Sequence, residues 1–510
     1  MARSRQRPRD GGGVAEHISG LIWAFALGAL AAAAASTQAA AAPKAPLDHD
    51  GRWLTDSTGR VVILHGFNLV YKVGSYRPED TGFGRDDARF LHRHGFNTIR
   101  LGIIYKGLEP DPPGPDGTPE YRRGYLKSIA RTERVLAKQK IFSLLDFHQD
   151  MYNERFQGEG WPDWQTLDDG LPAAPQNGFP GNYLTMQALQ RAFDHFWAND
   201  PAEGVPLQDA YASAWRHVAK RFERRRYVAG YDLLNEPWPG SVFPTCLNPA
   251  GCPGFDSTLT EFSKRTIAAI RKVDRRTLAF YEPNVLFDFG ARTSHGDTGD
   301  PHAGFSFHPY CLAGGGGVAA PTCAASEALT FQNANDHTAR TGDAPLVTEF
   351  GASDDLVDTR RVIDLADDHM VGWQYWHYCD CDDPTTTGPG VQAVVIDPSR
   401  PPRGDNVKRE KLRLLARPFP QAVAGTPRSF SFDPDTAVFE LAYATSSPED
   451  ELLPRRAQTE VRVPEINYPD GYRAEAEGAT ITSRRNAPVL RLKRAAGARE
   501  VHVTVRPRFA

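Results

Sequence analysis

Short apolar runs recur along most of the chain, and polar residues follow the end of each run. Each run has the length of a buried parallel strand, and helical stretches separate the runs. This alternation is typical of an α/β protein, and polar residues gathered at strand ends are typical of the active face of a (β/α)8 TIM barrel. We predict barrel strands at roughly 61–68, 97–103, 141–147, 228–235, 277–283, 304–310, 345–350 and 371–378.

The predicted barrel domain spans residues 46–412 and carries one long insert at about 150–226. The insert is richer in aromatic side chains than a βα loop requires, and these are Trp161, Trp164, Phe179, Tyr183, Phe193 and Phe196. Two interpretations stay open. The aromatic residues form either the core of a helical insert or an apolar wall or lid beside the active face.

Residues 418–510 have a different pattern, with short alternating runs that turn residues separate. This pattern predicts a C-terminal antiparallel β-sandwich, with strands near 430–432, 438–443, 460–463 and 501–505. Its last strands are basic, which suits either a solvated strand face or attraction to an anionic lipid surface. A small hairpin is also predicted at 53–62, before the first barrel strand.

Residues 1–42 have the pattern of a secretory signal peptide. Arginines come first, an apolar stretch follows from about Leu21 to Ala35, and a small-residue run ends near Ala42. We therefore expect a secreted protein with a cleaved leader. An uncleaved membrane anchor is the alternative, although the apolar stretch is short and Ala-rich for a bilayer span of roughly 20 residues.

A net charge of −4 and a pI near 6.4 give no indication of nucleic-acid binding. Six cysteines fit an exported protein, and their spacing allows two local disulfides, Cys246 with Cys252 and Cys311 with Cys323. Cys379 and Cys381 suit a disulfide or buried thiols. A metal site is the alternative there, but no Cys-x-x-Cys or His-Glu-x-x-His pattern supports it.

Two of the apolar runs end in a glutamate, Glu236 within residues 233–238 and Glu349 within residues 346–351. Two carboxylates at two strand ends of one barrel can face each other across a sugar, where one protonates the leaving oxygen and the other attacks the anomeric carbon. We interpret Glu236 as the general acid/base and Glu349 as the nucleophile of a retaining β-glycosidase. Otherwise, Glu236 is a loop residue that caps the next helix.

Other strand ends supply supporting groups. Arg100 is expected to lower the pKa of Glu349, to form a structural ion pair inside the barrel, or to do both. Tyr310 is expected to donate a hydrogen bond to Glu349. His308 is interpreted as orienting Glu236 or a sugar hydroxyl, or as a structural residue only.

Five further polar or aromatic residues are candidates for sugar contacts, namely Lys72, His148, Asp150, Asn235 and Trp376. His148 and Asp150 point to one face of an extended strand end, because they are two residues apart. Asn235 suits the 2-hydroxyl of the sugar, where contacts strengthen in the transition state. Trp373 and Trp376 suit either ring stacking on a sugar or packing in the barrel wall.

Together these motifs resemble family 5 of the glycoside hydrolases, and within it the endoglycoceramidases. The resemblance rests on Leu64-His65-Gly66-Phe67-Asn68, Asp146-Phe147-His148-Gln149-Asp150, Leu234-Asn235-Glu236-Pro237-Trp238, Thr348-Glu349-Phe350-Gly351, Gly372-Trp373-Gln374-Tyr375-Trp376 and Phe430-Ser431-Phe432-Asp433-Pro434. It spans nearly the whole mature chain.

This resemblance implies hydrolysis of the bond between an intact glycan and the ceramide of a glycosphingolipid. It implies Glu236 as acid/base and Glu349 as nucleophile, and it implies that Lys72, His148, Asp150, Asn235, Tyr310 and Trp376 contact or support the sugar. No metal or organic cofactor is implied. The expected partner is a glycosphingolipid in a membrane or micelle, with no nucleic acid. A monomer is expected.

Two other functions stay open. A secreted family 5 enzyme acting on a polysaccharide or a steryl glucoside would share both glutamates. A non-catalytic carbohydrate- or lipid-binding protein is the remote alternative, and it would not need the pair.

Overall fold

The computed structural model describes residues 42–311, 320–386 and 390–509, which lie in one compact unit that runs from Ala42 onward. The predicted signal peptide lies outside the described residues, except for Ala42. Within the described part of the chain, no helix combines the length and the apolar character that crossing a membrane requires.

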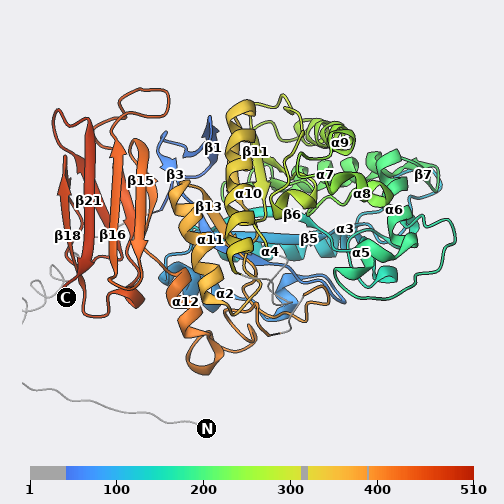
Figure 1. Cartoon of the computed structure of the whole chain (residues 1–510), viewed down its shortest axis with the longest axis horizontal. Coiled ribbons are helices and arrows are strands. Elements are labelled where there is room, and N and C mark those ends of the chain that lie inside the picture. The colour runs from blue at the N-terminus through green and yellow to red at the C-terminus, as the bar shows by residue number, and fades with distance from the viewer. Residues whose placement is uncertain (1–41, 312–319, 387–389, 510) are drawn as a thin grey trace, which may run out of the picture. The chain divides into compact units, whose positions relative to one another are not determined.

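Eight parallel strands close into a barrel, as the apolar pattern predicts (Figure 1). In barrel order the strands are β4 (His65–Leu69), β5 (Thr98–Ile104), β6 (Phe142–His148), β9 (Val228–Asp232), β10 (Leu278–Tyr281), β11 (Ala303–Phe307), β12 (Ala344–Val347) and β13 (Gly372–Tyr375). All of them are buried along their whole length. Parallel strands buried on both faces explain the continuous apolar runs in the sequence.

The two predicted strands that precede Glu236 and Glu349 are too long at the end that carries the chemistry. The run predicted at 345–350 stops pairing at Val347, and the run predicted at 228–235 stops at Asp232. The residues beyond these points are still buried, so the apolar pattern continues after the ladder has ended. Glu236 and Glu349 therefore lie in loops just past their strands.

Helices surround the barrel, and helical segments connect its strands. The α-helices are α2 (Arg85–Arg93), α3 (Tyr105–Leu108), α4 (Arg123–Lys138), α5 (Gly181–Thr185), α6 (Gln187–Ala198), α7 (Leu207–Phe222), α8 (Phe243–Cys246), α9 (Pro253–Arg271), α10 (Ala320–Thr341), α11 (Leu356–Asp368) and α12 (Arg409–Leu415). Short 3-10 helices are η1 (Pro78–Thr81), η2 (Glu154–Phe156), η3 (Asp163–Gln165), η4 (Gly240–Val242), η5 (Val285–Phe289), η7 (Gly404–Asn406) and η8 (Glu465–Asn467).

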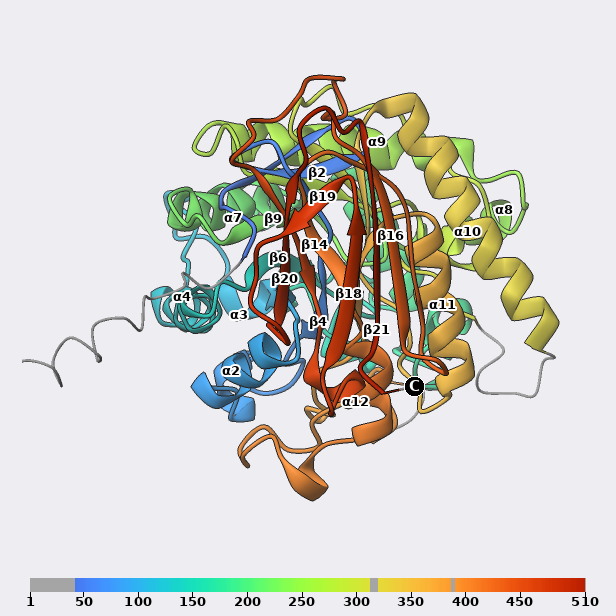
Figure 2. The same cartoon turned by 90° about the vertical axis from the view of Figure 1, so that its left-hand side faces the viewer.

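Two packed sheets form the predicted β-sandwich. The first joins β15 (Thr426–Asp433), β16 (Val438–Ala444), β21 (Glu500–Pro507) and β18 (Tyr472–Glu477). The second runs in the order β1 (Leu47–Asp50), β2 (Trp53–Asp56), β3 (Val61–Val62), β14 (Phe419–Val423), β17 (Gln458–Arg462), β20 (Val489–Arg494) and β19 (Ala479–Ile481). Apolar side chains from both sheets share one core, and Figure 2 shows the sheets face on.

The sandwich is not purely C-terminal. The predicted hairpin forms as β2 and β3, but it extends the second sheet because Val61 of β3 pairs with Val423 of β14. The first barrel strand, predicted at 61–68, is consequently divided. Its first two residues pair in the sandwich, and only β4 enters the barrel.

The insert between β6 and α7 has its own aromatic core, which it shares with α7. Trp161 is 1% exposed and stacks on Tyr152 and Tyr211, with Phe193 and Phe196 at its edge. Trp161 is therefore core rather than an apolar wall. Trp164 and Phe179 are partly buried against the same cluster. A small hairpin, β7 (Pro201–Ala202) with β8 (Val205–Pro206), closes the insert.

All six cysteines pair. The bonds are Cys246–Cys252, Cys311–Cys323 and Cys379–Cys381, so the last pair forms a disulfide rather than a thiolate metal site. The three bonds lie in segments that follow β9, β11 and β13.

Candidate active site

Glu236 is held at the barrel mouth by its own backbone. It lies four residues after β9 and has φ = 43°, a left-handed conformation that costs a non-glycine residue of order 1 kcal/mol. The Glu236 N–H donates to Glu282 Oε2 at 2.8 Å, and Gln149 Nε2 donates to the Glu236 carbonyl at 3.2 Å. These two bonds fix the direction in which the Glu236 side chain leaves the loop.

Glu349 lies two residues after β12, and both of its oxygens are bonded. Arg100 Nη1 donates to Oε1 at 2.5 Å, and the Tyr310 hydroxyl donates to Oε2 at 3.1 Å. The structure thus brings Arg100 and Tyr310 to the carboxylate that the sequence assigned to them. The loop after Glu349 ends where Asp355 caps α11, accepting from the N–H groups of Val357 and Asp358.

The two glutamates face each other beside one histidine. A carboxylate oxygen of Glu236, a ring nitrogen of His308 and a carboxylate oxygen of Glu349 all lie within 4.8 Å of one another. His308 Nδ1 is 3.0 Å from Glu236 Oε1, and Nε2 is 3.0 Å from Thr348 Oγ1. Burial alone would lower the pKa of His308, but Glu282 and Glu349 outweigh burial and raise it well above its ordinary value.

Arg100 is the central cation of the site. It is fully buried, and its guanidinium contacts four carboxylates, those of Asp146, Asp232, Glu282 and Glu349. It also donates to the Asn235 side-chain oxygen at 3.0 Å. These bonds engage Nε, Nη1 and Nη2, a use that only the arginine fork allows.

The net pKa shift of Glu349 is opposite to the one expected from Arg100 alone. Burial raises the pKa to about 6, while His308, Arg100 and His148 lower it only in part. The expectation counted the cation and left out the cost of removing a carboxylate from water.

The sugar-contact candidates Lys72, His148, Asp150 and Trp376 form one cluster next to Glu349. Lys72 Nζ is 2.7 Å from Asp150 Oδ2 and 4.4 Å from the centroid of the Trp376 ring. The His148 ring stacks on Trp376 at 5.2 Å, and its Nδ1 is 4.0 Å from Glu349 Oε1. Asn235 lies between Arg100 and the Gln149 carbonyl, to which its Nδ2 donates.

Opposite charges hold this cluster in its ionised form. Burial would lower the pKa of Lys72, but Asp150 and Asp383 outweigh burial and raise it. Burial would raise the pKa of Asp150, but Lys72 and His148 outweigh burial and lower it. Burial would likewise lower the pKa of His148, and Asp146 instead raises it to about 10. Lys72 and His148 are therefore cations at neutral pH.

Lys72 lies beside one group of residues that could share a metal ion. His148, Asp150 and Glu159 are close enough to share an ion, but Lys72 Nζ lies 2.7 Å from Asp150 and 3.9 Å from Glu159. Arg100 holds Glu349 in the same way.

Sequence patterns alone did not identify two groups of site residues. Glu282 follows β10 and bonds both Arg100 and the Glu236 backbone, and Asp383 and Thr385 both contact Lys72 Nζ. Glu282 ends a predicted strand, as the assigned residues do, so that rule could have found it. Trp373, in contrast, is fully buried and stacks on His65, which makes it barrel-wall packing.

Comparisons with known proteins agree with this geometry. The family model described as "Cellulase (glycosyl hydrolase family 5)" matches residues 55–382, and the "Glycoside hydrolase family 5 C-terminal domain" matches 417–506. Endoglycoceramidase I of Rhodococcus hoagii is 32% identical over 464 residues, with 88% of this chain and 86% of the relative covered. An endoglycoceramidase of Hydra vulgaris is 29% identical, with 83% and 81% covered.

Solved structures show the same architecture. Endo-glycoceramidase II from Rhodococcus sp. superposes with a TM-score of 0.73 at 29% identity, over 89% of this chain and 99% of that one. Its complex with ganglioside GM3 gives a TM-score of 0.70 at 28% identity, with the same coverage. The match of the family model over most of the barrel, together with these relatives, shows that the chain is a glycoside hydrolase and belongs to family 5.

Proposed function

We propose that this enzyme is a retaining endo-β-glycosidase that cuts the bond between the glycan and the ceramide of glycosphingolipids. One observation supports the retaining mechanism above all. Carboxylate oxygens of Glu236 and Glu349 lie within 4.8 Å of each other. Carboxyl groups about 5–5.5 Å apart are typical of retaining enzymes, because a separation of roughly 6.5–9.5 Å is needed to admit the water of an inverting reaction.

The two glutamates act in two steps. Glu349 Oε attacks the anomeric carbon while the Glu236 carboxyl gives its proton to the oxygen that leaves with ceramide, so a glycosyl ester forms and the glycosidic bond breaks. Water then attacks the same carbon and gives a proton to Glu236, and Glu349 leaves as a carboxylate. Arg100 and Tyr310 orient Glu349, and His308 orients Glu236.

The glycan binds on the side of the Lys72 cluster. Lys72, His148 and Asp150 offer fixed donors and an acceptor for hydroxyl groups, and Asn235 adds a contact near Glu236. Trp376 contributes its ring to the same wall. Charge-assisted hydrogen bonds of this kind are stronger than neutral ones, so this cluster can hold sugar hydroxyl groups firmly.

The ceramide side is supported by the names of the relatives and by exposed apolar side chains in α5 and in the segment after β9. Trp238 follows Glu236, and its ring contacts the rings of Tyr183 and Phe243. Leu184 and Val242, which are next to Tyr183 and Phe243 in the sequence, are 53% and 47% exposed, and Leu247 at the end of α8 is 62% exposed. Each buried methylene group of a lipid is worth about 0.8 kcal/mol, so contact with even a few of these side chains favours a lipid aglycone.

Product analysis distinguishes this proposal from its rivals. Lactosylceramide in detergent should give free lactose and ceramide on thin-layer chromatography, with no galactose or glucosylceramide. Cello-oligosaccharides and steryl glucosides serve as alternative substrates. Faster cleavage of either, with lactosylceramide left intact, would favour the polysaccharide or sterol function instead.

Export is a further proposal, and it rests on the signal-peptide pattern of residues 1–42.

The acid limb of the pH profile should report Glu349. Its pKa is raised to about 6, so lowering the pH through that value protonates the nucleophile and removes activity. We expect kcat/KM for an aryl lactoside to fall about tenfold per pH unit below the midpoint. Circular dichroism at each pH controls for unfolding. A midpoint near the ordinary glutamate value of about 4.3 would contradict the assignment.

Glu282→Gln should impair the step that needs the Glu236 proton. Glu282 Oε2 accepts from the Glu236 N–H and Oε1 accepts from Arg100, so an amide nitrogen in either place faces a donor. We expect kcat for lactosylceramide to fall about 10²-fold with little change in KM. An aryl lactoside with a good leaving group should lose much less in its glycosylation step. Equal loss on both substrates would indicate general structural damage.

A further inference from the structure

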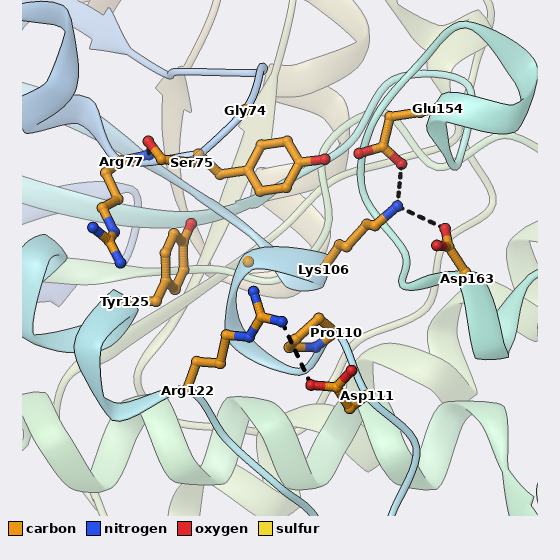
Figure 3. A pocket seen from close by; sticks show the side chains of 12 residues that line it. Gly74, Ser75, Arg77, Lys106, Pro110, Asp111, Arg122, Tyr125, Glu154 and Asp163 are labelled. Atoms are coloured by element: carbon orange, nitrogen blue, oxygen red, sulfur yellow. Dashed lines mark hydrogen bonds and ion pairs between the residues drawn. The ribbon is translucent and has the colours of Figure 1, made fainter.

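The structure contains a polar cavity of about 390 Å³ (Figure 3). It is lined by residues that follow β4, β5 and β6, among them Arg77, Lys106, Arg122 and Glu154. The same loops that carry Lys72 and Asp150 therefore continue into the cavity wall. The two sites share one segment, since Glu159 faces Lys72 and the carbonyl of Gly160 accepts from the N–H of Lys106.

Charge is divided unevenly within the cavity. At one end, Lys106 Nζ lies 2.7 Å from Glu154 and 2.6 Å from Asp163, so the acids outnumber the cation. Toward the other end, Arg122 has only a long contact of 3.5 Å with Asp111, and both side chains are more than half exposed, at 59% and 64%. An exposed pair of this kind is weak.

Arg77 is the unusual group. In the described parts of the chain its guanidinium makes no hydrogen bond or ion pair, and its Nε is buried without a partner. The nearby Glu79 is already bound through both oxygens by Arg131. Figure 3 shows Arg77 and Arg122 on either side of the Tyr125 ring. A buried donor without an acceptor is costly, and a guanidinium fork matches a carboxylate.

We propose that this cavity binds the anionic group of an acidic sugar, such as a terminal sialic acid carboxylate, at the distal end of the glycan. This inference rests on the proposed function and adds a preference for acidic over neutral glycans. Arg77 supplies the paired donors, and Arg122 adds a second cation when Asp111 moves away from it. The Tyr125 ring forms a fixed wall, because its hydroxyl accepts from the N–H of Ile104 at 2.8 Å.

The test compares ganglioside GM3 with lactosylceramide, which lacks only the sialic acid of GM3. Arg77→Gln should lower kcat/KM for ganglioside GM3 at least about tenfold and leave that for lactosylceramide within about twofold, because a charge-assisted bond is lost only with the acidic substrate. Arg89→Gln, an exposed arginine on α2, is the matched control and should change neither value. Lactosylceramide bearing a sulfate in place of sialic acid distinguishes a carboxylate site from a general anion site.

A soluble probe separates this inference from the lipid reaction. Against aryl lactoside hydrolysis, 3′-sialyllactose should inhibit wild-type enzyme better than lactose does, and Arg77→Gln should remove the difference. Equal inhibition by both sugars, or a loss in Arg77→Gln that is the same for GM3 and lactosylceramide, would overturn the subsite. Failure of wild-type enzyme to cut lactosylceramide would instead overturn the proposed function.

Discussion

Replacing Glu349 with Gln should reduce turnover of every substrate by about 10⁴-fold or more, including aryl lactosides with good leaving groups. An amide cannot form the glycosyl ester, and no leaving group corrects that defect. The loss should come without unfolding, because the amide oxygen still accepts from Arg100 in place of Oε1. Steady-state rates with lactosylceramide and a dinitrophenyl lactoside, together with thermal melting, measure both effects.

Glu236→Gln is the matched variant, and it should differ by substrate. A dinitrophenolate leaves without a proton, so formation of the glycosyl enzyme should stay near the wild-type rate in a pre-steady-state burst. Lactosylceramide needs the proton, and its cleavage should fall about 10²–10⁴-fold. Azide, which needs no general base, should speed release of the intermediate in Glu236→Gln and not in Glu349→Gln. The reverse pattern would exchange the two roles.

Arg100→Gln should destabilise the protein by about 3–5 kcal/mol, because it leaves buried carboxylates without their cation. Four acids share that one guanidinium, and burial already raises the pKa of Asp232 to about 8 against the opposing effect of Arg100. Without Arg100 the pKa values of Asp232 and Glu349, which burial already raises, rise further, so the folded variant binds more protons than the unfolded chain. The loss of stability should therefore be smaller at pH 5 than at pH 8.

Urea unfolding at the two pH values measures this effect. Arg100→Lys keeps the charge but not the fork, and it should give an intermediate loss. Arg89→Gln should stay within about 0.5 kcal/mol of wild type at both pH values, since Arg89 is exposed. A loss for Arg100→Gln below 1 kcal/mol, or one that does not depend on pH, would show that the carboxylates do not depend on Arg100.

The period and length of apolar runs were sufficient to find every barrel strand, because strands buried on both faces have few polar residues. They were insufficient to find where pairing stops, since Glu349 follows residues that stay buried past Val347. The pairing of Val61 with Val423 joins residues far apart in the chain, and no local pattern carries that information. Local patterns predicted the elements, and tertiary packing decided their partners.

The sequence likewise predicted some residues of the candidate site and missed others. Glu236 and Glu349 were found because short motifs surround them, and Arg100 was found at a strand position. The strand-end rule could have identified Glu282 as a site residue, but not its role, because its bond to the backbone N–H of Glu236 is a contact that only the folded loop creates. Counting aromatic residues also could not distinguish an open wall from a core, and Trp161 proved to be core.

Trapping the covalent intermediate tests the central claim most directly. A 2-deoxy-2-fluoro-lactoside with a good leaving group should glycosylate the enzyme and release its leaving group faster than water can hydrolyse the resulting glycosyl ester. Intact mass spectrometry should show one added fluorolactosyl group, and peptide mapping should place it on Glu349, within residues 345–351. An adduct on Glu236, or the absence of any adduct from an enzyme that releases α-configured product first, would contradict the mechanism.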